Sequence, residues 1–118
     1  MSEIEIVVYY DRNFPNAWIE PQYSISISSF FQQNGVAIVD ASKLEDFMTA
    51  SIDQRVAHRK IVMFSQDVVP STICRETGSN TLIREYLDAG GNVVWIGDIP
   101  LFYIGTRGST SPSQCIQA

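Results

Sequence analysis

The chain has 118 residues, of which 45% are hydrophobic and 18% are charged, and its net charge is −5. This length and apolar content predict a single domain with a buried core and exclude a disordered segment. The acidic balance and the scattered lysines and arginines argue against a nucleic-acid surface and against a basic membrane-binding face.

The N-terminal third predicts a strand, a loop and a helix. Residues 3–10 read E-I-E-I-V-V-Y-Y, a run of β-branched and aromatic residues typical of a strand in the middle of a sheet. Turn-forming residues over 11–16 predict a loop after it. A helix is predicted from Pro21 to Asn34. Its expected inward face consists of apolar residues at helical spacing: Tyr23, Ile27, Phe30 and Phe31. The alternation over 23–27 leaves a strand there as the alternative.

The central third predicts two strands around a second helix. Residues 36–40 read V-A-I-V-D, a short buried strand. Ser42 and Glu45 form the S-x-x-E pattern of a capping box, so a helix is expected over 43–52. The run K-I-V-M-F-S over 60–65 predicts the third strand. The connection that follows is expected to be mostly irregular, with one short turn after Pro70.

The stretch from Tyr86 to Tyr103 is the clearest part of the pattern. A third helix, expected over 80–89, ends at two glycines that can adopt the positive φ of a helix C-cap. The apolar run V-V-W-I over 93–96 then predicts a fourth strand, buried on both faces at the centre of a parallel sheet. Residues 105–118 are rich in Gly, Ser, Thr and Pro, which predicts a linker-like tail.

The alternation of strands and helices over residues 1–104 predicts an α/β domain. We expect a three-layer flavodoxin-like fold, with a parallel sheet of at least four strands in the order 2-1-3-4 and helices on both faces. The switch point of this order lies between the first and third strands, where a ligand site is expected. The linker-like tail suggests that the 118 residues are the N-terminal part of a longer protein.

Residues 60–104 resemble the flavodoxin-like domains of the class I glutamine amidotransferase-like superfamily. The resemblance is carried by the runs K-I-V-M-F-S-Q-D and L-I-R-E-Y-L-D-A-G-G-N-V-V-W-I-G. In those domains a helix with an L-x-x-Y-x-x-x-G-G ending leads into a strand and then into the nucleophile turn. The enzymes carry a catalytic Cys in that turn, whereas residues 96–100 read I-G-D-I-P and no His-acid pair follows. The resemblance therefore implies the fold without amidotransferase chemistry.

Three aspartates follow predicted strands at one expected edge of the sheet: Asp11, Asp67 and Asp98. They are the candidate ligand-binding residues, because carboxylates together could bind a hard cation such as Mg²⁺. Each also suits a turn or helix cap, and we expect this role. A phosphoacceptor site like that of receiver domains needs a lysine after its last strand, and no lysine follows Lys60. No metal and no cofactor are expected.

Two further residue types could carry chemistry. Cys74 has Arg75 beside it, and a neighbouring cation can lower the pKa of a thiol. His58 precedes the third strand, however, so it is expected at the opposite edge of the sheet. Ser65 ends that strand without a nucleophile motif around it. The two cysteines, Cys74 and Cys115, support neither a disulfide framework nor a zinc site, so reduced thiols are expected.

No apolar run approaches the roughly 18–20 residues of a membrane span, and the first residues are too acidic for a signal peptide, so a cytoplasmic protein is expected.

The sequence leaves two hypotheses of function. The first hypothesis is a non-catalytic interaction, sensing or signalling module. Its partner is a protein or further domains of the same chain, with no nucleic acid and no membrane. The alternative is a small-molecule-binding or hydrolytic domain completed by residues beyond 118 or by another subunit.

Overall fold

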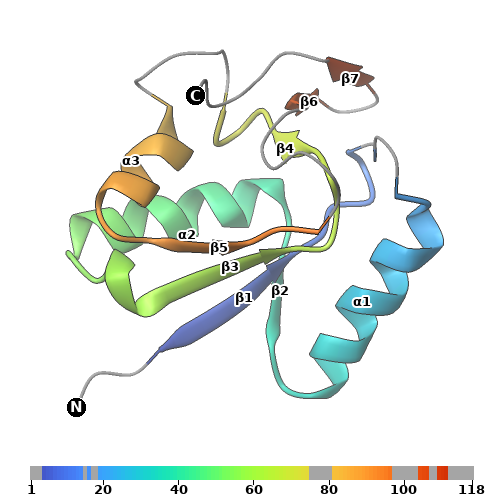
Figure 1. Ribbon diagram of the computed structural model, residues 1–118, viewed down its shortest axis with the longest axis horizontal. Helices are drawn as coiled ribbons and strands as arrows, with labels where there is room; N and C mark the ends of the chain where they lie inside the picture. Colours follow the sequence, from blue (N-terminus) through green and yellow to red (C-terminus); the bar gives the residue numbers. More distant parts are fainter. Residues whose placement is uncertain are drawn as a thin grey trace.

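The computed structural model describes residues 4–14, 16, 19–74, 81–96, 104–106 and 109–111. The elements follow in chain order in Figure 1: β1 (Glu5–Tyr9), α1 (Pro21–Gln33), β2 (Ala37–Val39), α2 (Ala41–Asp53), the 3-10 helix η1 (Ala57–Arg59), β3 (Lys60–Phe64), β4 (Val69–Pro70), α3 (Leu82–Asp88), β5 (Asn92–Val94), β6 (Ile104–Thr106) and β7 (Ser109–Ser111). Within the described residues, none of the helices has the length and apolar character needed to cross a membrane.

The main sheet has four parallel strands in the order β2-β1-β3-β5. Because β5 is the fourth strand of this sheet along the chain, the predicted α/β class and strand order are confirmed. Helices α2 and α3 lie on one side of the sheet and α1 lies on the other (Figure 1). The switch point of strand order falls between β1 and β3, as the sequence predicts.

A second, smaller sheet lies outside the predicted pattern. It has the order β4-β6-β7, with β4 and β6 parallel and β6 and β7 antiparallel. Strands β6 and β7 overlap the start of the predicted linker-like tail, so the described part of that tail differs from the prediction. Composition could not indicate this pairing, because it depends on β4, more than thirty residues earlier.

The main core lies between the sheet and helices α2 and α3. A row of aromatic rings crosses it, because Tyr9 and Phe64 are in register on neighbouring strands and Trp95 follows β5. The centroids of Tyr9 and Phe64 are 5.4 Å apart, and those of Phe64 and Trp95 are 5.0 Å apart. Such tilted pairs contribute about 0.5–1.5 kcal/mol beyond their buried area. The two helices contribute large, fully buried side chains to the same core: Leu44, Met48, Ile83 and Tyr86.

Helix α1 has nearly the predicted bounds, but the prediction of its inward face is wrong in part. Tyr23 and Phe30 are 57% and 60% exposed, whereas Ser24 and Ser28 are buried. The Ser24 hydroxyl accepts a hydrogen bond from Asn16 Nδ2 at 2.9 Å, and the Ser28 hydroxyl donates to a carbonyl of its own helix. These small, satisfied side chains therefore form the centre of the face toward the sheet.

Helix α2 begins earlier than predicted. Its N-cap is Asp40, whose Oδ1 accepts a hydrogen bond from the Lys43 backbone N–H at 2.8 Å. The predicted capping box of Ser42 and Glu45 is therefore wrong as the start of this helix. Strand β2 ends at Val39, and the extended backbone of Asp40 leads directly into the first turn.

Strand β5 lies at an edge of the sheet in the described part of the chain. Val94 is 42% exposed, and Val93, Trp95 and Ile96 are partly buried. The prediction of a strand buried on both faces is therefore wrong. An apolar run indicates which residues favour burial, but it does not show that a covering element is present.

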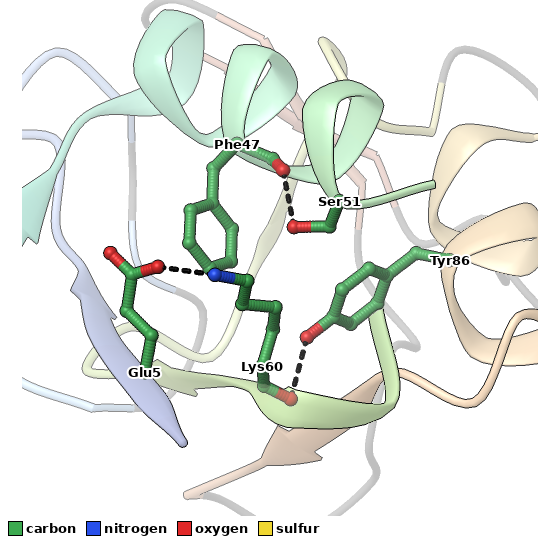
Figure 2. Close-up of polar contacts among 5 residues, drawn as sticks. All are labelled: Glu5, Phe47, Ser51, Lys60 and Tyr86. Carbon is green, nitrogen blue, oxygen red and sulfur yellow. Dashed lines mark hydrogen bonds and ion pairs between the residues drawn. The ribbon is translucent and has the colours of Figure 1, made fainter. Parts of the chain in front are cut away.

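Tyr86 of α3 joins the starts of β3 and β5 (Figure 2). Its hydroxyl lies 3.1 Å from the Lys60 carbonyl and 3.2 Å from the Asn92 carbonyl. Burial raises the pKa of Tyr86 to about 12. A Cβ at Gly91 would collide with the Tyr86 ring, and Gly90 has a φ of +96°. The Y-x-x-x-G-G ending of the sequence thus packs the helix against the sheet.

A charged pair lies beside this contact, at the amino edge of the sheet. Lys60 Nζ is 2.6 Å from Glu5 Oε1 and 5.9 Å from the centre of the Phe47 ring (Figure 2). The pair follows from the register, which places Glu5 opposite Lys60. Because the Glu5 side chain is 54% exposed, the ion pair is worth at most about 1 kcal/mol.

The Gly91→Ala substitution is expected to lower the free energy of unfolding by about 2–3 kcal/mol, because the added methyl group overpacks the ring of Tyr86. Gly35→Ala is the control: Gly35 has a φ of +86° and open space around it, so it costs only about 1–2 kcal/mol of backbone strain. Urea unfolding in a Tyr86→Leu background separates the two. In that background the loss of unfolding free energy caused by Gly91→Ala should be smaller, whereas the loss caused by Gly35→Ala should be unchanged. If Gly91→Ala costs the same in both backgrounds, the steric explanation is wrong.

Candidate functional site

The candidate site is the carboxyl edge of the main sheet, where an open α/β sheet binds its ligand. The loops after β1 and β3 meet at this edge, on the two sides of the switch point. Backbone hydrogen bonds continue the ladders past the strand ends: Tyr10 N–H donates to the Val39 carbonyl at 3.0 Å, and Ser65 N–H donates to the Tyr9 carbonyl at 3.1 Å. The first residues of both loops are therefore fixed by the sheet.

The side chain of Gln66 joins the two loops across the switch point. Its Oε1 accepts a hydrogen bond from the Asp11 backbone N–H at 2.8 Å. Its Nε2 donates to the Phe14 carbonyl at 3.0 Å and to Asn16 Oδ1 at 2.9 Å. Gln66 is only 3% exposed. Both amide hydrogens and the carbonyl oxygen of this buried side chain are used inside the protein.

The same network continues to the start of α1. Asn16 Nδ2 lies 2.9 Å from both the Ile19 carbonyl and Ser24 Oγ, and it donates to each. The Ile19 backbone N–H donates to Asp67 Oδ2 at 3.2 Å. The start of α1 is therefore fixed to the end of β3 by side chains that come from both loops.

The structure places two of the three predicted aspartates at this edge, and both accept backbone hydrogen bonds. Asp11 accepts from Asn13 N–H at 2.9 Å and from Ala41 N–H at 3.0 Å, so it closes its own turn and holds the start of α2. Asp67 is buried and accepts from Ile19 N–H. Asp98 lies outside the described residues. Within the described chain, no group of three His, Cys, Asp or Glu residues could hold a metal ion.

Two hydroxyl groups near the edge are also bonded to backbone carbonyls. Ser65 is fully buried, and its Oγ donates to the Tyr9 carbonyl at 2.7 Å. Thr72 Oγ1 donates to the Ala41 carbonyl at 2.8 Å, which fixes the turn after β4 to the start of α2. Because the Ser65 hydroxyl is buried and donates to the backbone, it is a poor nucleophile.

The thiol expectation is wrong for Cys74, which is fully buried and disulfide-bonded. The other cysteine, Cys115, lies outside the described residues. Spacing along the chain could not predict a disulfide at Cys74, because the approach of two cysteines depends on the tertiary fold. His58 lies in η1, before β3, while Cys74 follows β4, so the whole of β3 separates the two residues in the chain.

Tyr9 carries the most perturbed group at this edge. Burial, together with the carboxylates of Asp11 and Asp40, raises the pKa of Tyr9 well above its ordinary value. Its hydroxyl is one of three buried polar atoms of the described residues that have no hydrogen-bond partner, with Arg59 Nε and Trp95 Nε1. The phenol therefore stays neutral at physiological pH, and its burial costs free energy.

Comparison with known proteins assigns the family. The MJECL34 family matches residues 4–115. The chain belongs to this family. It is 33% identical over 109 residues to the "Uncharacterized protein MJECL34" of Methanocaldococcus jannaschii, a match that covers 89% of this chain and 36% of the relative. The chain thus spans about a third of the length of that relative. No solved structure matches this chain.

Sequence reasoning missed the two amides that connect the loops of this MJECL34-family chain. It singled out carboxylates because these bind cations, but the side chain that bridges the switch point is Gln66, and its side-chain partner is Asn16. Their positions gave a partial indication, since Gln66 directly follows Ser65 at the end of a predicted strand and Asn16 ends the predicted turn. No pattern indicated that the two would meet.

The Gln66→Glu substitution is expected to lower the free energy of unfolding by about 2–3 kcal/mol at pH 7, because the carboxylate cannot donate to the Phe14 carbonyl or to Asn16. Gln33→Glu adds the same charge at an exposed position in the last turn of α1, where the helix dipole should make it cost about 0.3–1 kcal/mol. Urea unfolding measures both variants. Equal effects of the two substitutions would show that the Gln66 hydrogen bonds contribute nothing.

The substitution of tyrosine by phenylalanine is expected to have opposite effects at two buried sites. Tyr86→Phe removes a bonded hydroxyl and should cost about 1 kcal/mol, whereas Tyr9→Phe removes an unbonded one and should leave stability unchanged or raise it by up to about 1 kcal/mol. The midpoints of urea unfolding decide this. A loss at Tyr9 as large as that at Tyr86 would mean that the Tyr9 hydroxyl is hydrogen-bonded.

Proposed function

We propose that this MJECL34-family chain is a non-catalytic, three-layer flavodoxin-like domain of the glutamine amidotransferase-like kind. It acts as an interaction, sensing or signalling module at the N-terminus of a larger protein. Its partner is a protein or another part of the same polypeptide, and its role is recognition rather than the chemical conversion of a substrate.

One observation carries this proposal: the polar groups at the carboxyl edge bond to one another. Gln66 uses its amide to join the two loops, and Asp11 and Asp67 accept backbone N–H groups. A ligand that entered between the loops would have to replace these hydrogen bonds. Removing a buried partner without a replacement costs about 1–3 kcal/mol for each group left unsatisfied.

The sequence resemblance supports the same proposal. The Y-x-x-x-G-G ending fits a packing role, since Tyr86 lies against Gly91 and reaches the start of β3. Residues 96–100, which correspond to the nucleophile turn of the amidotransferase enzymes, contain no cysteine. The parallel sheet with helices on its two sides supports the flavodoxin-like assignment (Figure 1).

A cytoplasmic location is part of the proposal, and the disulfide at Cys74 is the feature that argues against it. Disulfides are uncommon in cytosolic proteins, with those of hyperthermophiles as the exception.

Thermal unfolding with a ligand panel tests the proposal. Mg²⁺, ATP, NAD, FMN and glutamine, each at a concentration of about 1 mM, should shift Tm by less than about 1 °C. A ligand at 100 times its Kd adds about 2.7 kcal/mol, which in a domain of this size shifts Tm by several degrees. A shift of that size that disappears in Asp11→Asn would overturn the proposal in favour of a small-molecule site. Hydrolysis of glutamine or of an ester that one substitution abolishes would overturn it in favour of an enzyme.

A further inference from the structure

One face of the main sheet is apolar and only partly covered. Side chains alternate between the two faces of a strand, and residues in parallel register point to the same side. Ile6 is opposite Ile61, while Met63 is opposite Val94. These four side chains point to the face of the sheet on which α1 lies, because the side chains of their chain neighbours Glu5, Val7 and Val62 point to the opposite face, on which α2 lies. Ile6 and Val94 are each 42% exposed, and Ile61 and Met63 are partly buried.

Helix α1 covers only one half of this face. It packs mainly against β2 and β1, and among the described residues no helix lies over β3 and β5 on this face (Figure 1). Parallel sheets normally carry helices on both faces over their whole width. We use the name open face for the exposed apolar residues of this region on the sheet and on the adjoining flank of α1: Ile4, Ile6, Val94, Tyr23 and Phe30.

The flank of α1 that borders the open face is apolar. Around the helix, Tyr23 and Phe30 lie about 120° and 140° before the midpoint of the buried Ser24 and Ser28. Strand β2 lies on one side of β1 and β3 on the other, and the crossover through α1 is right-handed. In that geometry the flank that precedes the buried centre points toward β3. Tyr23 and Phe30 therefore lie on the outer part of the flank that borders the uncovered strands, and Ile25 lies on the opposite flank.

We propose that the open face binds one amphipathic α-helix of a partner protein, which lies beside α1 on β3 and β5. Two strands are about 10 Å wide, which is the diameter of one helix with its side chains. The sheet face from Ile6 to Val94 and the apolar flank of α1 at Phe30 give such a helix apolar contacts on two sides. The proposal rests on the proposed function as an interaction module and names the chemistry of its partner.

A second copy of the chain fits this surface less well. To cover the open face it would have to place its own α1 between two sheets. The side of α1 away from its own sheet is mostly polar, because Gln22, Ser26 and Gln33 are exposed there and Phe30 lies only at its border. The exposed apolar area of the open face is on the order of 500 Å², similar to the largest apolar patch of a typical monomer, which is often functional, and less than the roughly 800 Å² per partner of a stable dimer.

The surface also defines the character of the helix. Strand β3 is five residues long and α1 is thirteen residues long, so a partner helix of about three turns spans the face. The side chains of the open face carry no charge, so the contacting side of the partner is expected to be uncharged, with apolar residues at i, i+3, i+4 and i+7.

A displayed library of helix-forming peptides of about 15 residues, selected against the 118-residue chain, tests the proposal. Enriched peptides are expected to show apolar residues at i, i+3, i+4 and i+7. Ile6→Gln and Phe30→Gln should each weaken their binding by about tenfold or more. The matched control is Ile25→Gln, at a position 49% exposed on the other flank of α1, which should change binding by less than about twofold. Because all three positions are exposed, Tm should stay nearly constant.

Three outcomes would overturn the proposal: no enriched helix, enriched helices that Ile25→Gln weakens as much as Phe30→Gln does, or a dimer in light scattering that Phe30→Gln dissociates. The third outcome would identify a second copy as the occupant. A failed selection leaves the ligand-panel result unchanged and therefore rejects the helix without rejecting the interaction module. A ligand shift that Asp11→Asn removes rejects the module whatever the selection shows.

Discussion

The parallel pairing of β1 with β3 is the interaction on which the rest of the structure depends. Five consecutive residues of each strand are in register, from Glu5 opposite Lys60 to Tyr9 opposite Phe64. This register places an ion pair at the amino edge and an aromatic contact near the carboxyl edge. It also brings together the loops that Gln66 joins. A slip of one residue would exchange the two faces of the strand and break these contacts together.

The elements and their order were predictable because local patterns specify them. Runs of β-branched residues marked the strands of the main sheet, and Pro21 and Asn34 marked the ends of α1. The covered faces were not predictable, because they depend on contacts between distant residues. The burial of Ser24 depends on a bond from Asn16, and the exposure of Val94 depends on how far α1 reaches across the sheet. Apolar periodicity identifies a stripe but does not say which half of it meets a neighbour.

The position of the candidate site was predictable, but the use of its side chains was not. The strand order alone places the loops after β1 and β3 together at the carboxyl edge. Residue chemistry then favoured Asp11 and Asp67 as ligands, although capping was the expected role. The hydrogen bonds show that role for Asp11, whereas Asp67 accepts from the Ile19 backbone N–H ahead of α1. Gln66 makes most of the hydrogen bonds between the loops, and it has no sequence signature because amides are common in loops.

The free energy available for binding differs between the two surfaces of the domain. At the carboxyl edge a ligand would exchange existing hydrogen bonds for new ones, and each exchange is worth only about 1 kcal/mol net. At the open face no such exchange is needed, because Ile6, Val94 and Phe30 already contact water. Covering on the order of 500 Å² of apolar surface is worth about 10 kcal/mol before the cost of association is subtracted. That cost is about 4–15 kcal/mol, so binding there depends on a rigid partner that loses little freedom, and a preformed helix meets this condition.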